Sequence, residues 1–228
     1  MCTLEKRGSI FFLTLTGDDD HRFNPRVIGS ILSALRQAKS EATRGSVLIT
    51  TSQGKFFSNG FDLAWAQAAG SPSKSLERLS HMVSLFKPVV AELISLPMPT
   101  IAAVQGHAAA AGFLFALSHD YFLMRSDRGV LYMSEVDIGL SLPDYFVSTF
   151  RAKLGSVIAL RDVLLRGEKV KAGDAVRLGI LGGGSDRAWR KLGARKWKGD
   201  VYKEIRKSLY PELCETLGLG AEKVNSSL

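Results

Sequence analysis

The sequence predicts an α/β protein with a layered core of parallel strands, followed by a mainly helical C-terminal part. Two observations support this class. Short apolar, β-branched runs alternate with helical patterns over the first two-thirds of the chain, and helical patterns dominate from about residue 144 onward. The 228 residues are 46% hydrophobic, which is ample for one globular core. We therefore expect a core over residues 1–180 and a helical region over residues 181–228.

The first predicted strand covers residues 9–16, whose aromatic and β-branched side chains are typical of strands. Residues 18–21, three acids and a histidine, follow as a polar turn. Because consecutive acids point in diverging directions, we expect a solvated turn there rather than a metal site. A helix should begin at Asn24-Pro25, with Asn as the N-cap and Pro in the first turn, and its apolar side chains recur at helical spacing up to Leu35.

The middle of the chain continues the alternation of strands and helices. Residues 47–51 form a short apolar run suited to a buried strand, and a loop follows at 54–60. A long helix is expected over about 75–95, with a bend or restart at Lys87-Pro88. The remaining predicted elements are a strand at 100–104, a helix over about 109–118, and strands at 121–125 and 130–133.

Composition narrows the possible partners. No apolar run reaches 18 residues, so we expect no membrane span, and the N-terminal residues show no secretory signal. Two distant cysteines, Cys2 and Cys214, favour a reducing compartment. The net charge of +8 suits an anionic partner, either nucleic acid or a small ligand with several phosphates such as coenzyme A. The most basic stretch, residues 187–198, carries no nucleic-acid motif, which favours a solvated helical face and no nucleic acid.

Two loops that follow predicted strands carry the candidate chemistry. They cover residues 54–63 and 106–113 and are rich in small residues, which let a ligand approach the backbone closely. A helix that starts in such a loop points free N–H groups at the ligand. Two such loops side by side would give two donors to one oxygen, an oxyanion hole. Taken alone, the same residues also fit simple close packing.

Four segments in order resemble the crotonase (enoyl-CoA hydratase/isomerase) superfamily over about residues 8–180. The matching segments are Phe57-Ser58-Asn59-Gly60-Phe61-Asp62-Leu63, Pro99-Thr100-Ile101-Ala102-Ala103-Val104-Gln105-Gly106, Ala110-Ala111-Gly112 with His119-Asp120, and Ser134-Glu135-Val136-Asp137-Ile138-Gly139-Leu140. They resemble the family's F-x-x-G-x-D-[IL], P-x-[IV]-A-A-[IV]-x-G, small-residue turn with C-D pair, and P-E-x-x-x-G-[LI]. The resemblance implies a crotonase-type ββα spiral core with a C-terminal helical region.

The resemblance also implies a substrate, an acyl-CoA thioester, and the residues that bind it. The backbone N–H groups of Phe61 and Ala111 would hold the thioester oxygen as it becomes an enolate. The segment Phe61, Asp62 and Leu63 would lie along the adenine end of coenzyme A. The substrate pocket would be lined by Gly60, Ala110, Gly112, Leu114 and Leu140.

The carboxylates separate the reactions of this family. Hydratases use two glutamates, and this chain has Leu114 at the first of these positions and Glu135 at the second. A single base can remove a proton from C2 and return it at C4, which shifts a double bond. Apolar neighbours over residues 130–142 should raise the pKa of Glu135. We therefore expect a Δ3,Δ2-enoyl-CoA isomerase with Glu135 as its catalytic base; an enoyl-CoA hydratase and a non-catalytic acyl-CoA-binding homologue remain the alternatives.

We expect other polar residues to have structural roles. His107 and the pair His119-Asp120 are expected to be packed or hydrogen-bonded, and the glycines at 182–184, without the Lys-Ser/Thr of a phosphate loop, form a connector. We predict no metal and no redox cofactor, because coenzyme A arrives as part of the substrate.

The C-terminal part departs from the family pattern and is shortened after Gly179 relative to it. In the family this region covers the acyl pocket and builds trimers, so by resemblance we expect a homotrimer or hexamer. The final residues, Ser226-Ser227-Leu228, resemble the S-K-L signal read by the peroxisomal import receptor. The whole pattern looks most like the plant peroxisomal enoyl-CoA isomerases, which favours the peroxisome over the cytoplasm.

Overall fold

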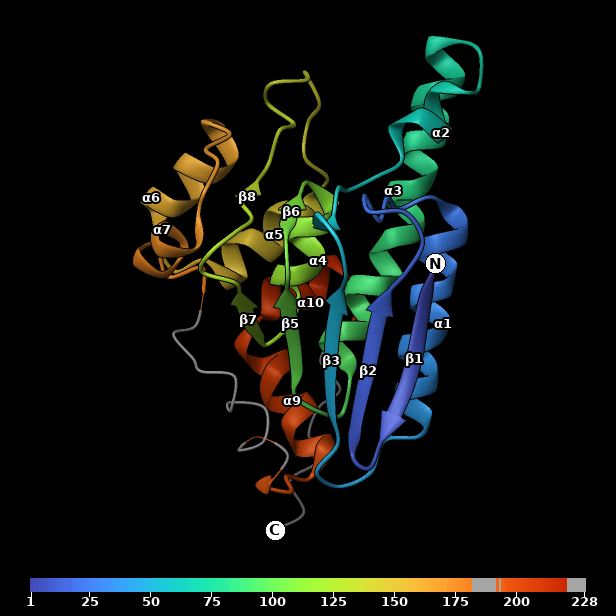
Figure 1. Cartoon of the computed structure of the whole chain (residues 1–228). Helices are drawn as coiled ribbons and strands as arrows, with labels where there is room; N and C mark the ends of the chain where they lie inside the picture. Colours follow the sequence, from blue (N-terminus) through green and yellow to red (C-terminus); the bar gives the residue numbers. More distant parts are fainter. Residues whose placement is uncertain (182–191, 193, 221–228) are drawn as a thin grey trace.

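The computed structural model describes residues 1–181, 192 and 194–220, and Figure 1 shows sheets flanked by helices. The larger sheet has the strand order β1-β2-β3-β5-β7. Its edge strand β1 runs antiparallel to β2, whereas the other neighbours are parallel. The five strands are β1 (Cys2–Arg7), β2 (Ile10–Leu15), β3 (Val47–Ser52), β5 (Thr100–Val104) and β7 (Tyr121–Met124).

The smaller sheet is parallel, in the order β4-β6-β8. Its strands are β4 (Phe56–Ser58), β6 (His107–Ala109) and β8 (Leu131–Tyr132). Each of them follows a strand of the larger sheet and precedes a helix, so the chain repeats a strand-strand-helix turn. The α/β class and the ββα spiral expected from the sequence are confirmed.

Helices α1 and α3 lie together on one face of the larger sheet (Figure 1). The N-cap of α1 is as predicted, because the Asn24 side chain accepts a hydrogen bond from the Val27 N–H at 3.1 Å. The helices are α1 (Pro25–Ser40), α2 (Leu63–Gln67), α3 (Pro72–Ser95), α4 (Ala111–Leu117), α5 (Asp144–Lys153), α6 (Val157–Leu160), the π-helical turn η1 (Arg161–Leu165), α7 (Ala172–Arg177), α9 (Gly199–Leu209) and α10 (Pro211–Thr216).

A cluster of buried phenylalanines joins the two sheets and the helices. Phe23 stacks on Phe86 with ring centroids 5.1 Å apart and meets Phe115 edge-on at 5.7 Å. Phe61 meets Phe86 edge-on at 5.6 Å. Such aromatic pairs contribute about 0.5–1.5 kcal/mol each beyond the burial of their area. The loop that carries Phe61 is therefore packed directly onto the core.

Local predictions failed at three places. β1 was missed because Glu5, Lys6 and Arg7 give it a polar, exposed pattern, which an edge strand tolerates. The strands β4 and β6 were missed because each has only three residues. Helix α3 does not restart at Lys87-Pro88 but runs unbroken, since Pro88 is exposed and the carbonyl it leaves unpaired, on exposed Ser84, can face water.

Within the described part of the chain, no helix is both long and apolar enough to cross a membrane.

Candidate active site

The first candidate loop leaves β4 at Ser58 and enters α2 at Leu63. Phe61 forms a parallel bridge with Phe23, in which the Phe23 N–H donates to the Gly60 carbonyl at 2.8 Å and the Asp62 N–H donates to the Phe23 carbonyl at 3.0 Å. The N–H of Phe61 takes no part in this bridge and has no acceptor among the described residues. It is therefore available to a ligand.

Asp62 shapes this loop rather than facing outward as a free charge. One oxygen of its carboxylate accepts the Trp65 N–H at 2.9 Å and caps α2, and the other accepts the Asn24 amide at 3.4 Å. Both bonds tie the loop to its surroundings. Asp62 and the partly buried Leu63 thus hold the end of the loop where it turns into α2.

The second candidate loop joins β6 to α4 through Ala110, which has φ 51° and ψ −126°. Positive φ is uncommon for a residue with a Cβ and marks a strained turn. The turn is held because the Ala110 N–H donates to the Tyr132 carbonyl at 3.0 Å and the Leu114 N–H donates to the Ala110 carbonyl at 3.1 Å. Ala111 is the first residue of α4, so its N–H has no partner within the helix.

The two loops touch at Gly60. A Cβ on Gly60 would lie 2.9 Å from the Ala110 Cβ and 3.3 Å from the Ala111 nitrogen, so only glycine fits. Gly60 also has φ 75°, which favours glycine. The free N–H groups of Phe61 and Ala111 therefore come from segments in direct contact.

Glu135 lies three residues beyond β8, the strand that pairs with β6. The carboxyl ends of the parallel strands β4, β6 and β8 thus lead to Phe61, Ala111 and Glu135 respectively, and adjacent parallel strands end at one edge of a sheet. The three predicted catalytic residues therefore follow the carboxyl ends of neighbouring strands, where ligands of α/β proteins commonly bind.

Burial perturbs the Glu135 carboxyl. Its Oε2 is buried and has no hydrogen-bond partner among the described residues. Desolvation raises the pKa of Glu135 above its usual value, opposed in part by hydrogen bonds from the backbone N–H groups of Ser134 and Glu135. A carboxyl with a raised pKa is a stronger base when ionised, as proton abstraction requires.

The apolar surroundings expected for Glu135 are only partly present. Leu131 and Met133 are buried, and Leu140 is partly buried. Val136 and Ile138, predicted to contribute, are instead 49% and 52% exposed. The prediction was wrong for these two because they lie in the turn between β8 and α5, where alternation no longer fixes which side chains point inward.

The residues predicted to line the pocket divide into two groups. Ala110 and Leu140 are partly exposed, whereas Gly60, Gly112 and Leu114 are buried. Leu114 has no exposed surface and packs in the core. The first of the two positions at which hydratases carry a glutamate is therefore apolar here, and a carboxylate placed there would be buried at high cost.

The histidine and metal predictions concern residues outside this cluster. His119 donates or accepts at both ring nitrogens, 2.9 Å from the Phe115 carbonyl and 2.7 Å from the Thr50 hydroxyl, and burial lowers its pKa to about 4. This confirms a structural role. His107 packs against Phe56 with ring centroids 5.0 Å apart. In the described part of the chain, no three or more His, Cys, Asp and Glu residues lie together in a group that could hold a metal ion. The predicted connector at residues 182–184 lies outside that part.

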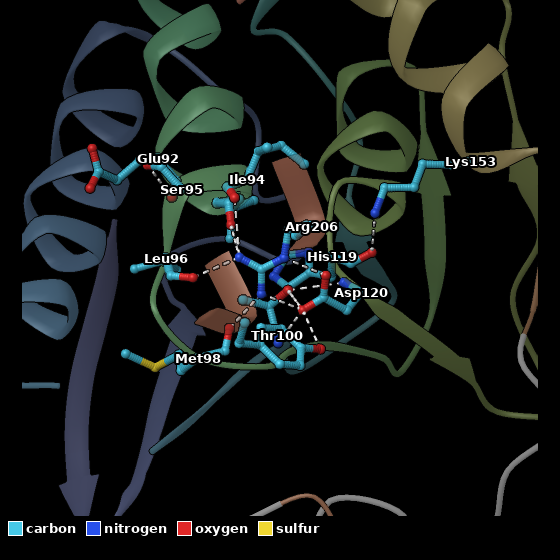
Figure 2. A network of polar contacts seen from close by, with 12 residues as sticks. Glu92, Ile94, Ser95, Leu96, Met98, Thr100, His119, Asp120, Lys153 and Arg206 are labelled. Atoms are coloured by element: carbon cyan, nitrogen blue, oxygen red, sulfur yellow. Dashed lines mark hydrogen bonds and ion pairs between the residues drawn. The ribbon is translucent and has the colours of Figure 1, made fainter. Parts of the chain in front are cut away.

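Sequence reasoning missed a buried polar network around Arg206 of α9 (Figure 2). Arg206 forms an ion pair with Asp120 at 2.6 Å and is 3% exposed. It also donates to four backbone carbonyls at and beyond the end of α3, those of Leu93, Ile94, Leu96 and Met98. A single arginine in an otherwise polar helical stretch gives no signal of burial. Only the match of His119-Asp120 to the family's C-D pair could have drawn attention to its partner.

Comparisons with known proteins agree with this fold. The family model described as enoyl-CoA hydratase/isomerase matches residues 5–183. The chain belongs to the enoyl-CoA hydratase/isomerase family, whose fold is the crotonase spiral. It is 63% identical to enoyl-CoA delta isomerase 2, peroxisomal, of Arabidopsis thaliana, with 96% of each chain covered, and 60% identical to enoyl-CoA delta isomerase 3 of the same plant, with 98% covered.

Solved structures support the same fold. A probable enoyl-CoA hydratase, EchA3, from Mycobacterium tuberculosis superimposes with a TM-score of 0.83, covering 96% of this chain and 92% of that one. Its sequence identity is 17%, so this likeness concerns the fold alone.

Proposed function

We propose that this protein is a Δ3,Δ2-enoyl-CoA isomerase, which moves the double bond of a 3-enoyl-CoA to the 2-trans position during β-oxidation of unsaturated fatty acids. Three observations support the proposal together. Glu135 is the only carboxyl among the described residues whose pKa is raised, Leu114 at the family's other glutamate position is buried, and the chain is 63% identical to a named enoyl-CoA delta isomerase. The peroxisomal names of two such relatives support a peroxisomal location.

The proposed reaction begins at the thioester carbonyl. Its oxygen accepts hydrogen bonds from the N–H groups of Phe61 and Ala111, neither of which has another acceptor among the described residues. As the proton leaves C2, negative charge moves onto this oxygen and both hydrogen bonds strengthen. Losing one such donor typically costs about 2.7–4 kcal/mol of transition-state stabilisation.

Glu135 then serves as the only base and the only acid. Its carboxylate takes the proton from C2, and electrons spread over the dienolate from the oxygen to C4. The protonated carboxyl gives the proton back at C4, which leaves the double bond between C2 and C3. No electrons are gained or lost, so coenzyme A enters only as part of the substrate and no other cofactor is needed.

The remaining assignments are part of the same proposal. The first loop, with Phe61, Asp62 and Leu63, would bind the adenine end of coenzyme A. The acyl chain would lie along the segments that hold Gly60, Ala110, Gly112, Leu114 and Leu140, of which Ala110 and Leu140 are partly exposed. By resemblance the assembly is a homotrimer or hexamer. Import would use Ser226-Ser227-Leu228, which lies outside the described residues.

The test compares wild type with Glu135→Gln, which keeps the shape of the side chain but cannot accept a proton. With 3-hexenoyl-CoA we expect the variant's kcat to fall by about 10²–10⁴-fold, the usual contribution of a general acid–base group. Asp137→Asn is the matched control, since Asp137 is an exposed carboxylate in the same turn. The proposal fails if Glu135→Gln keeps its turnover or if the wild type hydrates 2-hexenoyl-CoA and does not isomerise the 3-enoyl ester.

A further inference from the structure

Ser58 is a fully buried hydroxyl at the point where β4 enters the first loop. Its hydroxyl donates to the His21 carbonyl at 2.8 Å and accepts the Gly60 N–H at 3.3 Å. The side chain therefore links the turn before α1 to the residue that immediately precedes the Phe61 amide. None of the reaction steps above uses Ser58.

The His21 end of this link is firmly held. His21 has φ 46°, a conformation that needs support from its surroundings. Its N–H donates to the Asp18 carboxylate at 2.9 Å, and its ring Nε2 lies 2.8 Å from the Gln53 carbonyl. The His21 carbonyl accepts the hydrogen bond from the Ser58 hydroxyl. It is thus held in place by the contacts of the His21 N–H and of the His21 ring.

Ser58 also touches the segment that carries the second donor. A Cβ on Gly112 would overlap the Ser58 carbonyl oxygen and come within 2.7 Å of the Ser58 Cβ, so α4 packs directly against this residue. In the smaller sheet Ser58 pairs with Ala108, three residues before Ala111. Ser58 therefore contacts both donor segments at once.

We propose that Ser58 is a positioning residue, whose hydroxyl holds the Asn59–Gly60 peptide and thereby sets the Gly60 dihedral angles, so that the N–H groups of Phe61 and Ala111 converge on one oxygen. The inference rests on the proposed oxyanion hole. Gly60 has no side chain to restrict its dihedral angles, and its N–H is held by the Ser58 hydroxyl. The next peptide, Gly60–Phe61, is held at its carbonyl by the Phe23 N–H at 2.8 Å. Without the Ser58 acceptor the Asn59–Gly60 peptide can rotate, which changes the Gly60 dihedral angles and with them the direction of the Phe61 N–H.

The kinetic test uses Ser58→Ala with 3-hexenoyl-CoA. We expect kcat to fall about tenfold while KM changes by less than about twofold, because a misaligned donor weakens transition-state binding more than substrate binding. Ser58→Cys, which keeps a weak donor and acceptor, should recover part of the loss. The control is Ser118→Ala: Ser118 is equally buried and donates to the Leu114 carbonyl at 2.7 Å, but at the far end of α4.

A second readout does not depend on turnover. Hexanoyl-CoA labelled with ¹³C at the thioester carbonyl cannot isomerise, and its carbonyl stretching frequency falls when an oxyanion hole polarises it. We expect a clear downshift in wild type, Glu135→Gln and Ser118→Ala, and a smaller one in Ser58→Ala.

The outcomes separate the two proposals. If Glu135→Gln retains turnover while Ser58→Ala loses the downshift, the isomerase mechanism fails and the role of Ser58 stands. If Ser58→Ala keeps both kcat and the downshift, or if Ser118→Ala loses as much, Ser58 is only a packing residue. A wild-type complex without any downshift overturns the inference directly.

Discussion

Glu135 shows how one side chain can be set apart from the protein's other carboxyl groups. Its partial burial and unpartnered oxygen raise its pKa. Exposed acids such as Asp127, paired with Arg125, have a lowered pKa, here about 2, because a hydrogen bond from the guanidinium favours the charged form. Burial without a basic partner is what distinguishes Glu135, since the more deeply buried Asp120 is paired with Arg206 and has a lowered pKa.

This raised pKa predicts the acid side of the pH–rate profile. The base must be ionised, so kcat/KM should fall as pH drops through the Glu135 pKa, and this fall should lie above the ordinary value for glutamate, about 4.3. Initial rates with 3-hexenoyl-CoA across pH 4–8 measure it. An acid limb at or below the ordinary value would contradict the assignment of Glu135 as the base.

The same shift predicts a pH-dependent stability. Because the folded pKa is raised, the contribution of Glu135 is fully present below the unfolded pKa and is lost as pH rises through the folded pKa. Glu135→Gln should therefore leave Tm unchanged at the lowest pH where the protein folds and raise it near pH 7. Thermal unfolding at several pH values checks this, and a Tm gain that is constant with pH would argue against a raised pKa.

Two glycines offer a matched comparison. Gly112→Ala forces a Cβ onto the backbone of Ser58, so we expect a loss of about 1–3 kcal/mol in stability together with lower kcat. Gly173→Ala, in α7 with open space around it and no positive φ, should gain about 0.4–1 kcal/mol. Urea unfolding of both variants measures the contrast, and equal effects would show that the Ser58 contact is unimportant.

At the residue scale a motif can point to Glu135, Phe61 and Ala111, whose roles stay predictions, but it does not point to the contacts of Ser58 or Arg206. The first three occupy positions that a pattern of neighbours defines. The role of Ser58 depends on a carbonyl 37 residues away, and that of Arg206 on an aspartate 86 residues away. A side chain whose partners are fixed only by the folded chain carries no local signal.

At the scale of elements, Arg206 attaches α9 to the core. Its guanidinium donates hydrogen bonds to several carbonyls at the end of α3 and to both carboxylate oxygens of Asp120 (Figure 2). Burial alone raises the pKa of Asp120, but the charge and hydrogen bonds of Arg206 lower it overall. Lys153 adds a further contact by donating to the His119 carbonyl at 3.2 Å. Helix α9 is therefore held by a polar anchor.

Removing this anchor should be costly. Arg206→Ala leaves Asp120 buried without its partner, and breaking a buried pair in this way typically costs about 3–5 kcal/mol. Arg177→Ala, which removes an exposed pair with Asp174 on α7, should change stability by less than about 1 kcal/mol. Chemical denaturation distinguishes them, and a similar small effect of both would mean that α9 is held by apolar contacts instead.

Helices and strands were predictable where a clear hydrophobic periodicity extends over enough residues to be seen. The strands β2, β3 and β5 and helix α1 have clear periodicity and lie where the sequence placed them. Three-residue strands are too short for any period to show, and β1 is an edge strand whose side chains largely face water. The spiral itself followed from the resemblance, because periodicity does not specify how strands divide between two sheets.

At the scale of the whole molecule, net charge should assist substrate capture. The chain carries +8, and coenzyme A is anionic, so long-range attraction should speed their encounter. Salt shortens the reach of this attraction from about 10 Å at 0.1 M to about 3 Å at 1 M. We expect kcat/KM for 3-hexenoyl-CoA to fall about tenfold over that range. The N-acetylcysteamine thioester, without phosphates, should show little change, and equal salt effects on both esters would exclude steering.

The Arg206 anchor can form only late in synthesis of the chain. Protein synthesis proceeds from the N-terminus, so Asp120 and the end of α3 leave the ribosome before the arginine that pairs with them. The separation of 86 residues between Asp120 and Arg206 corresponds to roughly 4–17 s at about 5–20 residues per second. Throughout that interval the nascent core holds a carboxylate whose counterion has not yet been translated. A chain truncated before α9 would keep Asp120 without its arginine partner permanently. We expect the cell's quality-control machinery to treat such a chain as incompletely folded.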